Sequence, residues 1–186
     1  VESWNHAMAG PEEDVEGEEP PPPTLHQLAL SGDVDGLKGM VGGVKKDERA
    51  AVLADRNDKG LSALEIAATW GHADFVEALI GYGVEVTDAN SRGYTALHRA
   101  AMWGRVDCVG KLARQSTPDG PVDLDVRTLP SDDHPSGETA AALATRYKQA
   151  AAAAEVAAVL QERADEEARL LAEAEEKARK SSKKKK

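Results

Sequence analysis

The chain has 186 residues, with 23 Lys and Arg against 33 Asp and Glu and a formal net charge of −10 at pH 7. This balance argues against a nucleic-acid binder with a wholly basic surface, because phosphate contacts depend on Lys and Arg. The single cysteine excludes an internal disulfide and favours a reducing, cytoplasmic compartment, and no apolar run approaches the roughly 18 residues of a membrane span.

The chain begins with an acidic, proline-rich segment. Residues 1–24 hold seven acidic side chains and no Lys or Arg, and four consecutive prolines occupy positions 20–23. A segment of this composition buries too little apolar surface to offset the entropy lost on ordering. We therefore predict a solvated N-terminal tail over residues 1–23, unless a partner surface holds it in place.

An internal repeat with a period of 33 residues follows. The motif that begins at Gly60 recurs at Gly93, and Leu64, Ala67 and Trp70 each have an identical residue 33 positions later. Each copy is predicted to form two short helices. The first helix ends at a glycine, and the second begins just after it. No copy can bury its apolar face alone, so the copies are expected to stack into a solenoid.

Two weaker copies flank this pair, at residues 25–37 and 137–147. The first carries extra residues in 42–56, where residues 47–54 are predicted to add a helical turn. The last is preceded by 115–136, a stretch rich in Pro, Asp and Gly that indicates a long loop. We therefore predict four repeats over residues 24–161, the outer two being atypical, as terminal repeats usually are.

The period and the Thr95-Ala96-Leu97-His98 element resemble the ankyrin repeat. The resemblance implies an all-α ankyrin solenoid of about four repeats that binds other proteins. In that family the position of His98 is structural and hydrogen-bonds backbone groups. Residues 30–37, 82–105 and 144–147 further resemble ankyrin proteins of cilia and flagella, which implies an adaptor subunit of the axoneme, with other axonemal subunits and, by hypothesis, tubulin as partners.

The sequence contains no motif that carries catalytic chemistry. It has no nucleophile elbow, zinc-protease helix, phosphate-binding loop or dinucleotide fingerprint, and no Cys or His pair has zinc-ligand spacing. Cys108 stands alone beside Val109 and is expected to be buried. We therefore predict no enzymatic activity, no metal, no cofactor and no small-molecule substrate.

Large aromatic residues recur just before the glycine that ends the first helix of each repeat. Trp70 and Trp103 share this position, and Tyr147 falls in the same column. They either pack in the stacked core or form a surface to which a partner binds, and we favour the second, because aromatic side chains dominate interface hot spots. Together with the residues that flank the turn glycines, the predicted partner-binding set is Lys59, Leu61, Trp70, Arg92, Tyr94, Met102, Trp103, Arg146 and Tyr147.

The C-terminal part, residues 162–186, is predicted to extend the last helix of the repeats. Strong helix formers continue to residue 180 without Gly or Pro. Val156, Val159 and Leu160 are expected to pack on the last repeat. Leu170 and Leu171 have no repeat to cover them and are either a modest exposed feature or a docking stripe.

The chain ends in a basic tail, whose last four residues are Lys183, Lys184, Lys185 and Lys186. Such a block can serve nuclear import or bind nucleic acid, anionic lipid or an acidic protein surface. An alternative to the axonemal adaptor is therefore a cytoplasmic or nuclear ankyrin regulator with a C-terminal import signal. We expect neither nucleic-acid binding nor membrane binding from the chain as a whole.

Overall fold

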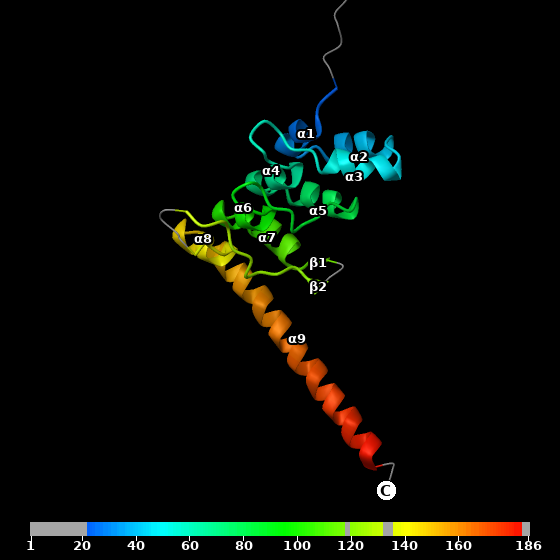
Figure 1. Cartoon of the computed structure of the whole chain (residues 1–186), viewed down its shortest axis with the longest axis vertical. Helices are drawn as coiled ribbons and strands as arrows, with labels where there is room; N and C mark the ends of the chain where they lie inside the picture. Colours follow the sequence, from blue (N-terminus) through cyan, green and yellow to red (C-terminus); the bar gives the residue numbers. More distant parts are fainter. Residues whose placement is uncertain (1–21, 118–119, 132–135, 184–186) are drawn as a thin grey trace, which may run out of the picture.

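The computed structural model describes residues 22–117, 120–131 and 136–183, and within them nine α-helices dominate. Eight of these helices form four antiparallel pairs: α1 (Leu25–Ser31) with α2 (Val34–Gly42), α4 (Ala63–Trp70) with α5 (Ala73–Gly81), α6 (Ala96–Met102) with α7 (Val106–Ala113), and α8 (Ala140–Arg146) with α9 (Ala150–Lys183). The pairs stack so that α1, α4, α6 and α8 form an inner row and α2, α5, α7 and the start of α9 an outer row (Figure 1). This arrangement confirms the predicted all-α solenoid with a long C-terminal helix.

Each inner helix begins at a hydroxyl residue that caps its free backbone N–H groups. Ser62 accepts a hydrogen bond from the backbone N–H of Glu65, whose carboxylate accepts one in return from the Ser62 backbone. Thr95 and His98 form the equivalent capping box in α6. Because each box satisfies two otherwise unpaired N–H groups, these helices of seven or eight residues start at fixed positions.

Neighbouring repeats are joined where one inner helix ends. Arg105 donates from Nε to the carbonyl of Thr69 at 3.0 Å, and the His72 ring lies 3.0 Å from the carbonyl of Leu30. At Gly71 the backbone has φ +85°, and a Cβ there would lie 2.9 Å from the Arg105 side chain. Glycine is therefore required both for the left-handed turn and for the close approach of the next repeat.

The core lies between the two rows of helices. Alanines on the inner helices are completely buried and let the helices approach closely: Ala29, Ala67, Ala100 and Ala144. Valines and leucines of the outer helices fill the other side of the core: Val76, Leu79, Val109, Leu112 and Val156. One continuous cluster of buried residues runs from α1 to α9, so stacking stabilises every repeat through its neighbours.

Two insertions interrupt the regular period. The first contains α3 (Lys46–Leu53), which confirms the predicted helical turn. The second holds an antiparallel pair of two-residue strands, β1 (Ser116–Thr117) and β2 (Gly120–Pro121). Apart from this strand pair the described residues of 115–136 form the predicted long loop, and Val122 and Leu124 are buried in the core and tie the insertion to the array.

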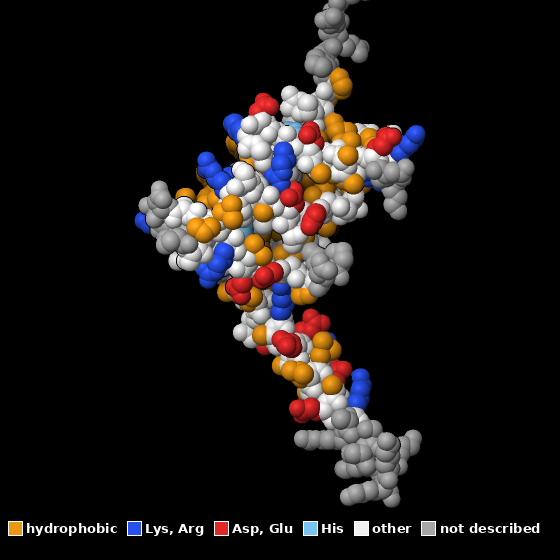
Figure 2. All heavy atoms as spheres, in the orientation of Figure 1, with side chains coloured by type: hydrophobic (Ala, Val, Ile, Leu, Met, Phe, Trp, Pro, Cys, Tyr) orange, Lys and Arg blue, Asp and Glu red, His pale blue; other side chains and the backbone are white. Residues whose placement is uncertain are grey.

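Helix α9 begins on the array and then leaves it (Figures 1 and 2). Val156 and Val159 are buried as predicted, whereas Leu160 is 42% exposed, so its assignment to the core was wrong. Leu170 and Leu171 are exposed, in agreement with the prediction. No described helix combines the length and the apolar character that a membrane crossing requires.

Several predictions fall on residues outside the described ranges, namely the acidic tail up to residue 21 and Lys184, Lys185 and Lys186. Lys183 is the last residue of α9. The domain boundary expected between residues 161 and 162 lies inside this continuous helix. Arg163, just beyond it, still donates to backbone carbonyls of Ala113 and Val122.

Candidate protein-binding surface

Three hairpin turns project next to the inner helices, and we call them fingers. Finger 1 spans residues 56–62 and finger 2 spans 89–95; finger 3 comprises residues 128–131 and 136–138, the described part of the third hairpin. Fingers 1 and 2 each close with an isolated antiparallel bridge, and finger 3 closes with a 3.0 Å bond from the Thr128 N–H to the carbonyl of Glu138. A glycine with φ between +69° and +75° turns each finger, in Gly60, Gly93 and Gly137.

A buried polar residue on each central inner helix connects that helix to the next finger or to the segment directly before it. His98 is 1% exposed, and its Nε2 lies 3.0 Å from the carbonyl of Val126. Burial lowers the pKa of His98, so its ring stays neutral and shares a hydrogen bond with the Thr95 hydroxyl. This confirms the structural role expected for His98.

The equivalent position in the preceding repeat holds a carboxylate, Glu65, which is also 1% exposed. It accepts a hydrogen bond from Asn90 of finger 2 at 2.8 Å and pairs with Arg56 of finger 1 at 2.9 Å. Arg99 from the following repeat lies 3.5 Å away. Two cations and an amide thus compensate the buried charge of Glu65 and fix the fingers on the inner helices.

The predicted aromatic column lies on the surface of the array. Trp70 is 56% exposed, Trp103 52% and Tyr147 47%, so the alternative that they pack in the core is excluded. Of the other predicted binding residues, Lys59, Arg92 and Arg146 are exposed. Tyr94 and Met102 are half-buried. Leu61 is also half-buried and packs partly against the core.

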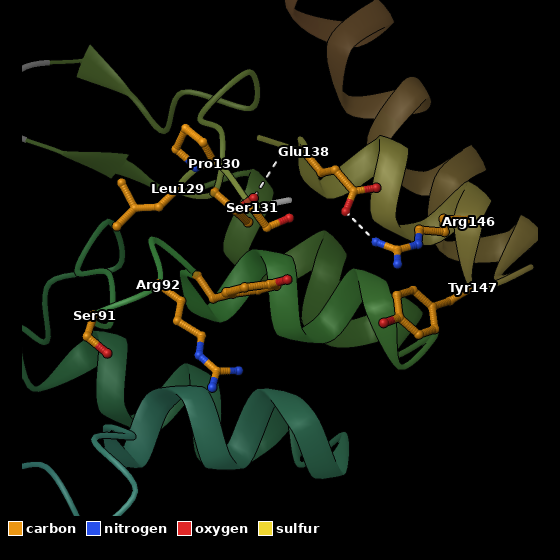
Figure 3. Close-up of a pocket in the computed structure, with 10 residues that line it drawn as sticks. Ser91, Arg92, Leu129, Pro130, Ser131, Glu138, Arg146 and Tyr147 are labelled. Atoms are coloured by element: carbon orange, nitrogen blue, oxygen red, sulfur yellow. Dashed lines mark hydrogen bonds and ion pairs between the residues drawn. The ribbon is translucent and has the colours of Figure 1, made fainter. Parts of the chain in front are cut away.

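Four of the predicted residues meet at one hollow of about 440 Å³ between fingers 2 and 3 and α8, namely Arg92, Tyr94, Arg146 and Tyr147 (Figure 3). Arg146 donates to the Glu138 carboxylate at 2.7 Å, and its guanidinium lies 5.5 Å from the centre of the Tyr147 ring. The hollow does not include the predicted residues of the second repeat, Lys59, Leu61 and Trp70, nor Met102 and Trp103 of the third.

Finger 3 supplies the part of this hollow that sequence reasoning missed. Leu129 is 57% exposed, and its backbone N–H donates to the carbonyl of Arg92 at 2.9 Å. This bond holds finger 3 beside finger 2. The match of Gly137 to Gly93 was the available signal, but the insertion before it concealed which residues form the opposite strand of the finger.

Reactive groups are sparse in the described part of the chain. No cluster of three His, Cys, Asp or Glu side chains there could hold a metal ion. Cys108 is completely buried as expected, and burial raises the pKa of its thiol to about 11. The thiol is therefore protonated at neutral pH and is not an activated nucleophile.

Comparison with known proteins agrees with this geometry. A family model for ankyrin repeats, in three copies, matches residues 25–128, which is more than half of the chain. The chain therefore belongs to the ankyrin repeat family, whose arrays are protein–protein interaction modules and typically not catalysts. The pair formed by α8 and α9 lies beyond the matched residues. No curated protein matched the chain in the search.

Proposed function

We propose that the inner face of the array binds a partner protein. We define the inner face as the exposed side chains of α1, α4, α6 and α8, the residues that directly follow α6 and α8 (Trp103 and Tyr147), and the described residues of the three fingers. The observation that carries the proposal is the exposure of Trp70, Trp103 and Tyr147 at equivalent positions of three successive repeats. These rings are about half exposed, so core packing does not account for them, and Trp and Tyr are enriched in interface hot spots.

The hollow beside Tyr147 supports the same proposal. Interfaces are enriched in aromatic residues, Met and Arg, and the hollow joins two tyrosines and two arginines from adjacent repeats. A partner side chain that entered it would contact both fingers at once. In this proposal Arg92 and Tyr94 of the third repeat and Arg146 and Tyr147 of the fourth form one site, and Trp103 and Trp70 extend it along the array.

We further propose that the bound partner is an axonemal subunit and that the chain is a structural or adaptor subunit of a cilium or flagellum. The support is the resemblance of residues 30–37, 82–105 and 144–147 to ankyrin repeat domain-containing protein 45. In this proposal residues 24–161 form the binding domain, and the charged segment 162–186, with its terminal lysines, adds an electrostatic contact to an acidic surface such as tubulin.

Trp103→Ala tests the inner face. Removing a central hot-spot ring should weaken partner binding by about 2–4 kcal/mol, while the unfolding midpoint changes little because the ring is half exposed. Proximity labelling in the native cell identifies the partner, and binding of that partner is then compared between the two forms. Leu171→Ala is the control, since Leu171 is 60% exposed, against 52% for Trp103, and lies outside the array.

A Trp103→Ala variant that unfolds before it loses its partner would show that the ring is structural.

The location of the protein in the cell has a separate test. Recovery in a salt-stable axonemal fraction supports the adaptor, whereas nuclear fluorescence that disappears on deletion of Lys183 to Lys186 supports the regulator with an import signal.

A further inference from the structure

Exposed aromatic rings recur along the inner face at the spacing of the repeats. Trp70 is the last residue of α4, and Trp103 and Tyr147 directly follow α6 and α8. Packed helices lie about 8–10 Å apart, so neighbouring rings recur at about this distance and the three rings extend over about 20 Å. A ligand that contacts every ring must therefore repeat with the same period.

The two tyrosines of the hollow are held in place by neighbouring side chains. The Tyr94 ring meets the buried His98 ring edge to face, with centroids 6.0 Å apart and an angle of 73° between the rings. Arg99 lies 5.5 Å from the centre of the Tyr94 ring, and Arg146 lies 5.5 Å from the centre of the Tyr147 ring. The rings are thus ordered before a ligand arrives, which lowers the entropy cost of binding.

The aromatic side chains of the inner face carry hydrogen-bond donors that the described protein does not use. Within the residues that the structure describes, no hydrogen bond is formed by the indole N–H of Trp70 or Trp103, or by the hydroxyl of Tyr94 or Tyr147. Each donor lies at the rim of a flat apolar ring. A ligand that stacks on the rings and also supplies acceptors would use both properties.

Charges on the inner face largely offset one another. Arg146 pairs with Glu138, and the buried Glu65 lies between two arginines. Two further acids, Asp132 and Asp133, occur in the sequence between the two described strands of finger 3. The charge of this face is therefore complementary to a ligand that is itself close to neutral.

We propose that the inner face recognises a proline-rich segment of its partner in the polyproline II conformation. This conformation has three residues per turn and rises about 3.1 Å per residue, so one side of the segment recurs about every 9 Å, which is the spacing of the rings. Leu129 and Pro130 lie across the hollow from Tyr147 (Figure 3) and add an apolar wall for a proline ring. The inference rests on the proposed function for the location of the site and names the chemistry of the partner.

Hydrogen bonding favours this ligand over an amphipathic helix. A helix presents the same side every seven residues, about 10.5 Å, which also approaches the spacing of the rings. Its backbone carbonyls are bonded within the helix, however, and would leave the indole and phenol donors unused. Polyproline II has no internal hydrogen bonds, so its carbonyls can accept from them, and its rigidity limits the entropy lost when it docks in an aromatic-lined groove.

Decaproline with blocked ends tests the proposal as an uncharged polyproline II probe. It is added to the full chain, in which Pro20→Ser, Pro21→Ser, Pro22→Ser and Pro23→Ser remove the internal proline run. The chain has three tryptophans, so their indole N–H groups give three signals in ¹H–¹⁵N spectra. Decaproline should shift the signals of Trp70 and Trp103 and leave that of Trp4 in place. Binding should not weaken between 0.1 M and 1 M salt, because the probe has no charge to screen.

Variants separate ring stacking from hydrogen bonding. Trp103→Ala should weaken decaproline binding by at least about tenfold, and Trp103→Phe, which keeps a ring but loses the N–H donor, by about fivefold. Leu171→Ala is the control and should bind as the parent does. Unshifted indole signals, an equal shift of Trp4, or a Trp103→Phe variant that binds like the parent would overturn the proposal. So would a helical peptide with leucine at every seventh position that shifts these signals where decaproline does not.

Partner binding separates this inference from the proposed function. If Trp103→Ala weakens binding of the native partner while decaproline leaves the indole signals unshifted, the choice of ligand alone is wrong. If decaproline binds at the rings while Trp103→Ala leaves binding of the native partner intact, the proposed function alone is wrong.

Discussion

The inner helices of the array and the free part of α9 are stable for opposite reasons. An inner helix has seven or eight residues, which is too short to be stable alone in water. It is held by buried alanines and leucines and by capping boxes. From residue 164 to 177 every side chain of α9 is exposed, so that part relies on its length, on strong helix formers and on weak ion pairs such as Arg169 with Glu173.

The difference shows that helix content and tertiary stability are separable in this chain. The array gains stability from contacts between repeats, so its helices should melt together. The free part of α9 has no tertiary contact to lose and should fray from its end at low cost. A substitution therefore reports on the region it lies in, and pairs of similar substitutions in the two regions give the sharpest contrasts.

The largest contrast is between two leucines. Leu97→Ala should lower the free energy of unfolding by about 2–5 kcal/mol through the cavity it leaves, because Leu97 is only 4% exposed. Leu171→Ala, at 60% exposure, should cost less than about 0.5 kcal/mol. Chemical denaturation of both variants measures this. Equal losses would mean that the end of α9 folds back onto the repeats.

A pair of arginines locates the boundary between the two regions. Arg163 donates to the backbone carbonyls of Val122 and Ala113, whereas Arg169 pairs only with exposed glutamates of its own helix among the interactions described. Arg163→Ala should cost about 1.5–3 kcal/mol, as expected for charged hydrogen bonds to partly buried groups. Arg169→Ala should cost less than about 0.5 kcal/mol. Similar midpoints for the two variants would place the end of the array before residue 163.

The sequence predicted the regular parts of the molecule better than the insertions. The period located the inner helices and the aromatic column, because identical residues in register imply identical surroundings, and the resemblance to ankyrin repeats supplied the structural role of His98. Three features could not be predicted, because they depend on how the insertion before the last repeat folds back onto the array. They are the burial of Val122 and Leu124, the anchoring of Arg163 and the contribution of Leu129 to the hollow. No internal copy existed with which to align that segment, and its composition alone indicated a loop.

The pH dependence of unfolding should report on the array alone. Burial lowers the pKa of His98 below its ordinary value of 6.5, so on acidification the unfolded chain takes up a proton before the folded one. Stability should therefore fall below pH 6.5, by up to about 1.4 kcal/mol per pH unit, until the folded pKa is reached. Denaturation between pH 7.5 and 5 should show a smaller slope for His98→Gln, and an unchanged slope would assign the effect to other groups.

The smallest expected effect lies at the junction where the array passes into α9. Lys148 occupies the position of Gly104 and Gly71 but has φ +59°, the one non-glycine residue with positive φ among the described residues. A side chain in this left-handed conformation costs about 1–2 kcal/mol, which glycine avoids, and glycine returns part of the gain because it makes the unfolded chain more flexible. Lys148→Gly should therefore stabilise the protein by about 0.5–1 kcal/mol, measured as a higher denaturation midpoint. Gly104→Ala, the reverse change at the equivalent turn, should destabilise it. If Lys148→Gly lowered the midpoint instead, the lysine side chain would have to stabilise the junction by more than its backbone strain costs. The side chain of Lys148, rather than the turn, would then fix the start of α9 on the array.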